Sequence, residues 1–263
     1  MGKNKLRKFA EVEQNPLVLQ YPFGRLSTEE FPYKGRWKEF FGNDKPIVLE
    51  LGCGKGEYTV GLGSRFHDRN FIGMDIKGAR IWSGATEALR RGMDNVAFLR
   101  TSIELLDRFF APDEVSEIWI TFPDPQMKKV NKRLTGTRMT ELYTRVLAPG
   151  GLIKLKTDSP FLFTYTEMMA RHNGLEILDR GTDIHAERPA DDPLVAIRTH
   201  YEQQWLDRGL SIKYLCFRPD ASKTLAEPPE AEDIPMDTYR SYSRGYIQMP
   251  EQMAESQTEK QNN

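Results

Sequence analysis

Apolar residues follow two patterns between about residue 46 and residue 219, and the two alternate along the chain. Short continuous apolar runs are typical of strands that are covered on both faces of a parallel sheet. Such runs fall at 47–49, 70–76, 95–100, 115–121, 152–156, 175–178 and 212–218. Apolar side chains at helical spacing lie between several of them, at 57–66, 78–92, 135–147 and 161–172. The pattern predicts an α/β fold with a seven-stranded, mostly parallel sheet and helices on both faces.

The two ends of the chain lack this alternation. Residues 1–45 carry aromatic and proline pairs without a long period, so we expect an arm that lies over the main domain, 46–219. Residues 220–263 are rich in proline and acidic side chains, and this composition predicts an acidic, mostly disordered tail. A long insertion at 181–208 separates the last two predicted strands.

The first predicted strand runs into a glycine-rich turn, IVLELGCGKG at 47–56. Gly52, Gly54 and Gly56 lack a Cβ, so the backbone can turn sharply and approach a ligand closely. A strand, a glycine turn and a helix form the first half of a Rossmann-like unit. Dinucleotide sites prefer G-x-G-x-x-G, in which a helix N-terminus faces a pyrophosphate. Here Glu50 stands two residues before the first glycine, and its carboxylate favours an amino group over a pyrophosphate.

The second predicted strand ends with Asp75, 21 residues after Gly54. An acid about 20 residues beyond the glycine turn is where such folds hold a ribose hydroxyl. A ligand with a ribose and an ammonium group but no pyrophosphate fits Glu50 and Asp75 together, and S-adenosylmethionine (SAM) is such a ligand. The alternative is that the three glycines only form a turn. The sequence contains no G-x-x-x-x-G-K-[ST] motif, which excludes a P-loop.

A second motif, Phe122-Pro123-Asp124-Pro125, follows the fourth predicted strand. The two prolines restrict the backbone, so we expect a pre-oriented carboxylate at the carboxyl edge of the sheet, where open α/β sheets bind ligands. A basic cluster follows it, formed by Lys128, Lys129, Lys132, Arg133 and Arg138. Beside a ligand site, this cluster indicates a polyanionic substrate whose phosphates it binds. A solvated loop is the alternative.

The cysteines, the histidines and the hydropathy of the chain argue against a disulfide framework, a metal site and a membrane span. Cys53 and Cys216 do not form a disulfide framework, and the four histidines have no metal-ligand spacing, so we predict no metal. No apolar run is long enough to cross a membrane, and no apolar segment follows the basic residues at the N-terminus, so neither a membrane span nor a signal peptide is expected. The prediction is a cytoplasmic protein.

The chain resembles the bacterial tRNA (guanine-N7-)-methyltransferases, which are class I SAM-dependent methyltransferases. The resemblance rests on ELGCGKG at 50–56, GMDIKG at 73–78, TFPDP at 121–125, LAPGGLIKLKTD at 147–158 and T-x-Y-E at 199–202. It implies methyl transfer from SAM to N7 of a guanine in the variable loop of tRNA, at position 46. It does not require an obligatory protein partner.

The resemblance also implies roles for particular residues. The residues expected to bind SAM are Glu50, Gly52, Gly54, Asp75, Ser102 and Asp124. Asp124 is also the expected catalytic residue, at the junction of the cofactor and the target base. The residues expected to face the tRNA are Lys128, Asp158, Thr199, His200, Tyr201 and Glu202. Three features depart from the family pattern: Ser102 replaces an aspartate, Gln126 replaces a tryptophan, and the basic stretch before Leu134 is about two residues shorter.

Alternatives remain open at this stage. Asp124 and Asp158 can also be turn or helix caps. A SAM-dependent enzyme that methylates an exocyclic amine of another RNA or a small molecule has similar motifs, and a non-catalytic RNA-binding protein can retain a vestigial SAM fold. The intact acids Glu50, Asp75 and Asp124 argue against the last of these.

Overall fold

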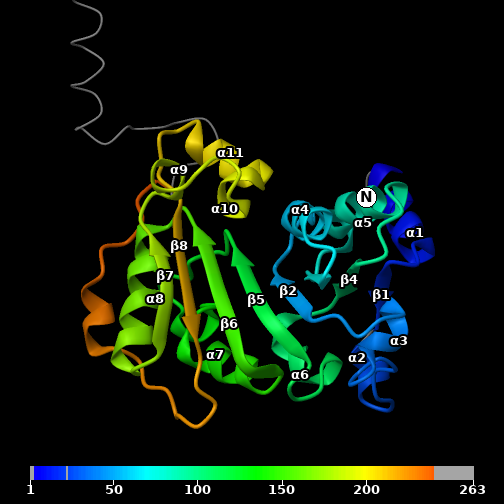
Figure 1. Ribbon diagram of the computed structural model, residues 1–263, viewed down its shortest axis with the longest axis horizontal. Helices are drawn as coiled ribbons and strands as arrows, with labels where there is room; N and C mark the ends of the chain where they lie inside the picture. Colours follow the sequence, from blue (N-terminus) through cyan, green and yellow to red (C-terminus); the bar gives the residue numbers. More distant parts are fainter. Residues whose placement is uncertain (1–2, 22, 240–263) are drawn as a thin grey trace, which may run out of the picture.

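A single sheet with helices on both faces forms the body of the protein (Figure 1). The computed structural model describes residues 3–21 and 23–239. The strands within them are β1 (Val18–Gln20), β2 (Ile47–Leu51), β3 (Asn70–Met74), β4 (Val96–Arg100), β5 (Val115–Thr121), β6 (Leu147–Thr157), β7 (Glu176–Gly181) and β8 (Lys213–Arg218). They lie in the order β1-β4-β3-β2-β5-β6-β8-β7, and all are parallel except β8, which is antiparallel to β6 and β7. The predicted α/β class is therefore confirmed.

Helices connect the strands and cover the sheet. The α-helices of the described residues are α1 (Lys3–Gln14), α2 (Phe23–Leu26), α3 (Trp37–Phe41), α4 (Glu57–Arg65), α5 (Gly78–Arg90), α6 (Leu106–Phe109), α7 (Thr137–Thr144), α8 (Pro160–His172), α9 (Ile184–Glu187), α10 (Pro193–Ala196) and α11 (His200–Leu206). Short 3₁₀ turns lie at Ile103–Leu105, Val130–Lys132 and Pro229–Asp233. One core layer joins the sheet to α1, α4 and α5, and the other joins it to α6, α7 and α8.

The central strands form where the apolar runs predict them because both of their faces are buried. All five residues of β2 and all five of β3 are buried, as expected for the centre of a parallel sheet. One strand, β1, was not expected. It consists of only three residues and pairs with β4 at the edge of the sheet, so the described sheet has eight strands and not seven. A three-residue run carries too little periodicity to be recognised in a sequence.

The N-terminal segment is held to the body by an aromatic cluster. Trp37 stacks on Phe110 with ring centroids 5.2 Å apart, and its indole nitrogen donates to the Phe109 carbonyl at 3.1 Å. Phe31 packs against the same Trp37 at 5.5 Å. The helix α1 instead packs on α5, on the opposite face of the sheet. Residues 3–21 and 23–45 thus contribute to both core layers.

Residues 220–239, which we call the C-terminal strap, run along α8 toward α11 (orange in Figure 1). They are anchored by hydrogen bonds, such as Tyr165 Oη to Glu227 Oε2 at 2.7 Å and Phe161 N to Asp237 Oδ1 at 3.1 Å. Ile234 and Asp237 are buried. This part of the predicted disordered tail is therefore packed against the domain, because its proline and acidic residues find specific partners there. Residues 240–263 lie outside the described residues.

Candidate functional site

Most of the predicted site residues lie just beyond the carboxyl ends of β2 to β6, at one edge of the sheet. A groove of about 300 Å³ lies along this edge. Gly52 and Asp75 line it beside the ends of β2 and β3, and Ser102 lines it beyond the end of β4. Gln126 and Lys132, from the loop after β5, form its other wall. The groove has the position at which open α/β sheets bind their ligands.

The glycine turn brings its backbone to the groove. Gly52, Gly54 and Gly56 all have positive φ values, of 73°, 56° and 72°, a region that side-chain-bearing residues rarely adopt. A Cβ on Gly56 would also lie 2.5 Å from the ring of Phe98. The turn is bonded to the acid at the end of β3, because the amide of Gly54 donates to Asp75 Oδ2 at 3.0 Å. The glycines therefore form a turn, and the first of them, Gly52, also lines the groove.

Glu50 is a buried acid at the end of β2, with 3% of its surface exposed. Thr121 Oγ1 donates to its Oε1 at 2.6 Å, and the backbone amide of Thr59 donates to its Oε2 at 2.8 Å. Burial raises the pKa of the Glu50 carboxyl to about 7, although the hydrogen bonds from Thr121 and Thr59 favour the ionised form. A cationic ligand group near Glu50 would stabilise the carboxylate.

Asp75 and Ser102 are arranged around the far end of the groove. The Asp75 carboxylate is 8% exposed and accepts from the amide of Lys77 at 2.8 Å as well as from Gly54. Both bonds fix its orientation beside the lining residue Ile76, which is 61% exposed. Ser102 precedes the 3₁₀ turn that starts at Ile103. The predicted positions for a ribose and an adenine thus line one continuous groove.

Asp124 is exposed on a loop with unusual backbone geometry. Phe122 and Gln126, on either side of Pro123-Asp124-Pro125, have positive φ values of 48° and 49°. Such conformations are strained for residues other than glycine and cluster at functional sites. Asp124 Oδ1 accepts from the amide of Gln126 at 3.1 Å, so it shapes the turn while its carboxylate remains open to solvent. The loop holds an accessible negative charge next to a residue that lines the groove.

The basic cluster divides into exposed and buried members. Lys128, Lys129 and Lys132 are exposed. Arg133 is only 4% exposed, which corrects its assignment to a phosphate-binding surface. Its guanidinium lies 4.3 Å from the ring centre of Tyr165, and it donates to the Met127 carbonyl at 2.8 Å. Arg133 therefore anchors the loop from inside, because the aromatic rings of α8 offer it a cation–π site.

The T-x-Y-E segment forms the N-terminus of α11. Thr199 Oγ1 accepts from the amide of Glu202 at 3.1 Å, and Glu202 bonds back to the amide of Thr199, which makes a capping box. His200 and Tyr201 are exposed, with Tyr201 at 42%. The amide of His200 donates to Glu57 at 3.2 Å, so α11 is tied to the start of α4, next to the glycine turn.

Glu202 is fully buried, and its carboxylate is used within the fold. It accepts from Lys156 Nζ at 2.8 Å, and both side chains are 0% exposed. His185 Nε2 lies 2.9 Å from its other oxygen. Burial lowers the pKa of Lys156, while Glu202 opposes this shift. The carbonyl of Lys156 also accepts from the amide of Phe122 at 2.8 Å, so the residue that binds α11 is joined to the loop that carries Asp124.

Asp158 follows β6 and is 1% exposed. The alternative that it caps the next helix is wrong, because the N-cap of α8 is Ser159, whose Oγ accepts from the amide of Leu162 at 2.9 Å. Asp158 Oδ2 instead accepts from the hydroxyl of Tyr239 in the C-terminal strap at 2.7 Å. The structure therefore places Asp158 at the same edge of the sheet as Asp124, but beneath the strap.

Four residues that bond to the predicted acids are not identified by the sequence pattern. They are the partners of the predicted acids: Thr59, Thr121, Lys156 and Tyr239. The only signal was the placement of Lys156 near the end of a predicted strand, where a buried charge requires a partner. That partner, Glu202, lies 46 residues away in the chain and is not identifiable from local pattern.

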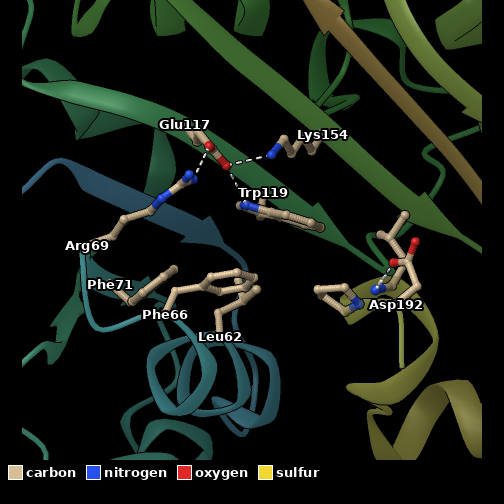
Figure 2. A pocket seen from close by; sticks show the side chains of 10 residues that line it. Leu62, Phe66, Arg69, Phe71, Glu117, Trp119, Lys154 and Asp192 are labelled. Carbon is tan, nitrogen blue, oxygen red and sulfur yellow. Dashed lines mark hydrogen bonds and ion pairs between the residues drawn. The ribbon is translucent and has the colours of Figure 1, made fainter. Parts of the chain in front are cut away.

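A second cavity, of about 240 Å³, lies on the sheet between α4 and α10 (Figure 2). Phe66, Phe71 and Trp119 line it, and Glu117 pairs there with Arg69 and with Lys154, the latter at 2.7 Å. Glu117 is bonded to both cations, so their charges are partly neutralised within the fold. None of the predicted site residues lines this cavity.

Neither a membrane span nor a metal cluster is found in the part of the chain that the structure describes. None of the helices within 3–21 and 23–239 is long and apolar enough to cross a membrane. The same residues contain no group of three or more histidine, cysteine or acidic side chains that could hold a metal ion. The groove itself is lined by two acids, two hydroxyl residues, two amides and one lysine: Asp75, Glu104, Thr101, Ser102, Gln126, Asn131 and Lys132.

Comparisons with known proteins agree with this arrangement. Residues 44–215 match a family model described as "Putative methyltransferase". The chain is 58% identical over 245 residues to the tRNA (guanine-N(7)-)-methyltransferase of Bacteroides fragilis (strain YCH46), covering 93% of this chain and 96% of that protein. It is 59% identical over 236 residues to the protein of the same name from Porphyromonas gingivalis (strain ATCC BAA-308 / W83), covering 89% and 96%.

Solved structures show the same fold at low sequence identity. A structure of an antibiotic-related methyltransferase aligns with a TM-score of 0.54 and 16% identity, over 73% of this chain and 96% of that one. The 16S rRNA methyltransferase KamB aligns with a TM-score of 0.54 and 12% identity, over 72% and 94%. These neighbours support the methyltransferase fold alone.

Proposed function

We infer the function of this chain from its family, because it belongs to the tRNA (guanine-N7-)-methyltransferases. It is an enzyme that transfers a methyl group from SAM to N7 of a guanine in tRNA. The observation that carries the assignment of the site is the exposed Asp124, on a strained loop that leads into three exposed lysines and that lines the groove with Gln126 and Lys132. The target that we propose is the guanine at position 46, in the variable loop.

The groove fits the chemical groups of SAM. We propose that Asp75 holds the ribose hydroxyls and that Gly52 and Gly54 let the backbone approach the ligand. Glu50 is suited to the α-ammonium group, because a buried carboxylate gains most from a neighbouring cation. Ser102 is suited to the adenine end of the groove. Bound SAM supplies an electrophilic methyl group on a sulfonium.

The acceptor requires little proton chemistry from the protein. Guanine N7 carries an exposed lone pair and no proton, so placement of the base accounts for most of the acceleration. We propose that Asp124 accepts hydrogen bonds from the guanine and that its charge stabilises the positive charge that develops on the methylated ring. The exposed His200 and Tyr201 complete the proposed substrate side. The buried side chains of Asp158, Thr199 and Glu202 were expected to face the tRNA, and we propose instead that they act by positioning the end of β6 and the N-terminus of α11.

The proposed reaction is tested by incubating the enzyme with methyl-labelled SAM and unmodified bulk tRNA, followed by digestion to nucleosides. We expect the label in 7-methylguanosine. Label in an amine-methylated nucleoside would instead support the exocyclic-amine alternative. Binding of SAM without any transfer to tRNA would favour a small-molecule substrate or a non-catalytic RNA-binding protein.

The affinity for SAM is expected to depend on pH through Glu50. Its carboxyl has a raised pKa of about 7, so it is mostly protonated at pH 6 and must lose that proton to pair with an ammonium group. The Kd for SAM should therefore rise by up to about tenfold per pH unit below pH 7 and level off above pH 8. Calorimetry in two buffers of different ionisation enthalpy should detect close to one released proton at pH 6.

A matched variant identifies the source of that proton. Glu50→Gln keeps an oxygen that can accept from the amide of Thr59, and its NH2 group can donate to the Thr121 hydroxyl, but the titrating group is removed. The variant should bind SAM more weakly at pH 8 and release no proton at pH 6. A Kd that is independent of pH in the wild type would contradict the assignment of Glu50 to the ammonium group.

Binding of tRNA is expected to weaken steeply with salt. Exposed lysines that contact phosphates release counterions, so log K should fall linearly with log salt concentration. Lys128→Gln should reduce the magnitude of this slope by about 0.7 to 0.9. Lys38→Gln serves as a control, because Lys38 is also exposed but lies on α3, in the N-terminal segment. Equal slopes for the wild type and Lys128→Gln would remove Lys128 from the tRNA surface.

A further inference from the structure

The C-terminal strap contacts each segment that we assign to the tRNA. The amide of Asp237 lies 3.1 Å from Met127 Sδ, in the loop that carries Asp124 and the lysines. The Tyr239 hydroxyl donates to Asp158 at 2.7 Å, and the Tyr239 ring packs edge-on against Trp205 of α11 with centroids 5.4 Å apart. The strap thus meets the Asp124 loop, the end of β6 and α11.

The strap lies outside the segment that matches the family model, which ends at residue 215. Its contacts with the domain are nevertheless specific. Asp237 is 6% exposed and accepts hydrogen bonds from Ser159 Oγ and from the amide of Phe161 at the start of α8. These bonds fix the chain two residues before Tyr239, so the position of the Tyr239 ring does not depend on its own contacts alone.

We propose that Tyr239 is a positioning residue of the methyltransferase site, which orients the Asp158 carboxylate and fixes α11 relative to it. This inference rests on the proposed function, in which the segment around Asp158 and the N-terminus of α11 form the substrate side. A carboxylate that is 1% exposed is oriented by its hydrogen-bond donors, and a tyrosine hydroxyl at 2.7 Å is a strong one. The packing of Tyr239 on Trp205 transmits the same constraint to α11.

The chain offers a matched control for the loss of this hydroxyl. Tyr21 also donates to a carboxylate, at 3.0 Å, but its partner is Glu29, in the N-terminal segment. Tyr239→Phe and Tyr21→Phe therefore remove the same kind of hydrogen bond and retain the ring. Both variants keep the aromatic packing, on Trp205 in one case and on Phe31 in the other.

The experiment measures kcat and KM for tRNA, the Kd for SAM and the Tm of the full-length chain. Tyr239→Phe should lower kcat/KM for tRNA about tenfold, the effect of one lost hydrogen bond to a charged group, with an unchanged Kd for SAM. Tyr21→Phe should leave kcat/KM unchanged. Asp158→Asn should lower it at least as much as Tyr239→Phe, and the double variant should be within about twofold of Asp158→Asn, because the two residues act as a unit.

Several results would overturn the inference. Equal kcat/KM for Tyr239→Phe and the wild type would remove Tyr239 from the site, and a higher value would indicate that the strap occludes Asp158. Additive effects in the double variant would separate Tyr239 from Asp158. If the wild type forms no 7-methylguanosine in tRNA, the proposed function is wrong and this inference is wrong with it. If the wild type is active but Tyr239→Phe has no effect, only the role of Tyr239 is wrong.

Discussion

Replacement of Asp124 with asparagine is expected to lower kcat for tRNA methylation by about 100-fold or more, the usual effect of losing a preorganised electrostatic contact. The Kd for SAM should be unchanged if Asp124 acts mainly on the guanine. Asparagine retains the side-chain oxygen that accepts from the amide of Gln126, so the turn is preserved while the charge is lost. Single-turnover methylation of tRNA, followed as 7-methylguanosine, measures the effect on the chemical step.

Two further measurements distinguish charge from turn geometry. Asp124→Ala removes both the charge and the turn hydrogen bond and should be at least as slow as Asp124→Asn. Asp68→Asn is a control for the removal of an exposed acid, because Asp68 lies in the turn between α4 and β3. If Asp124→Asn methylates tRNA at the wild-type rate while Asp124→Ala does not, Asp124 acts only as a turn residue.

Replacement of Lys156 with methionine is expected to lower the free energy of unfolding by about 3 to 5 kcal/mol, because Glu202 would then be a buried charge without its cation. Both side chains are 0% exposed, so water cannot take the place of the lost partner. The loss is a large part of the stability of an ordinary domain. Urea denaturation at pH 7, with equal slopes for wild type and variant, measures it.

Lys154→Met is the matched control, since Lys154 lies two residues earlier on β6 and is bonded to Glu117 at 2.7 Å (Figure 2). Glu117 keeps Arg69 as a partner, so the expected loss is smaller, about 1 kcal/mol. Glu202→Gln combined with Lys156→Met should recover about half of the lost stability, because the unpaired charge is gone and glutamine still forms a capping box. If Lys156→Met and Lys154→Met lose the same free energy of unfolding, the Lys156–Glu202 pair stabilises the protein no more than the Lys154–Glu117 pair does.

The sequence by itself determined the fold class and which acids lie at the carboxyl edge of the sheet. The predicted runs at 47–49, 70–76 and 95–100 correspond to β2, β3 and β4, because strands buried on both faces must be continuously apolar. The ends of parallel strands share one edge of the sheet, so the order of motifs along the chain sufficed to bring Glu50, Asp75 and Asp124 to that edge. The family resemblance, carried by the same motifs, is confirmed by the relatives.

Only the tertiary structure decided which charged groups face solvent. Arg133 and Lys132 are adjacent in the sequence, yet one is buried on the rings of α8 and the other lines the groove. Glu202 is buried because Lys156 is available on β6, and Asp158 is covered because the strap returns along α8. Each outcome depends on a partner that is distant in the chain, whereas composition and periodicity report only neighbours within a strand or a few helical turns.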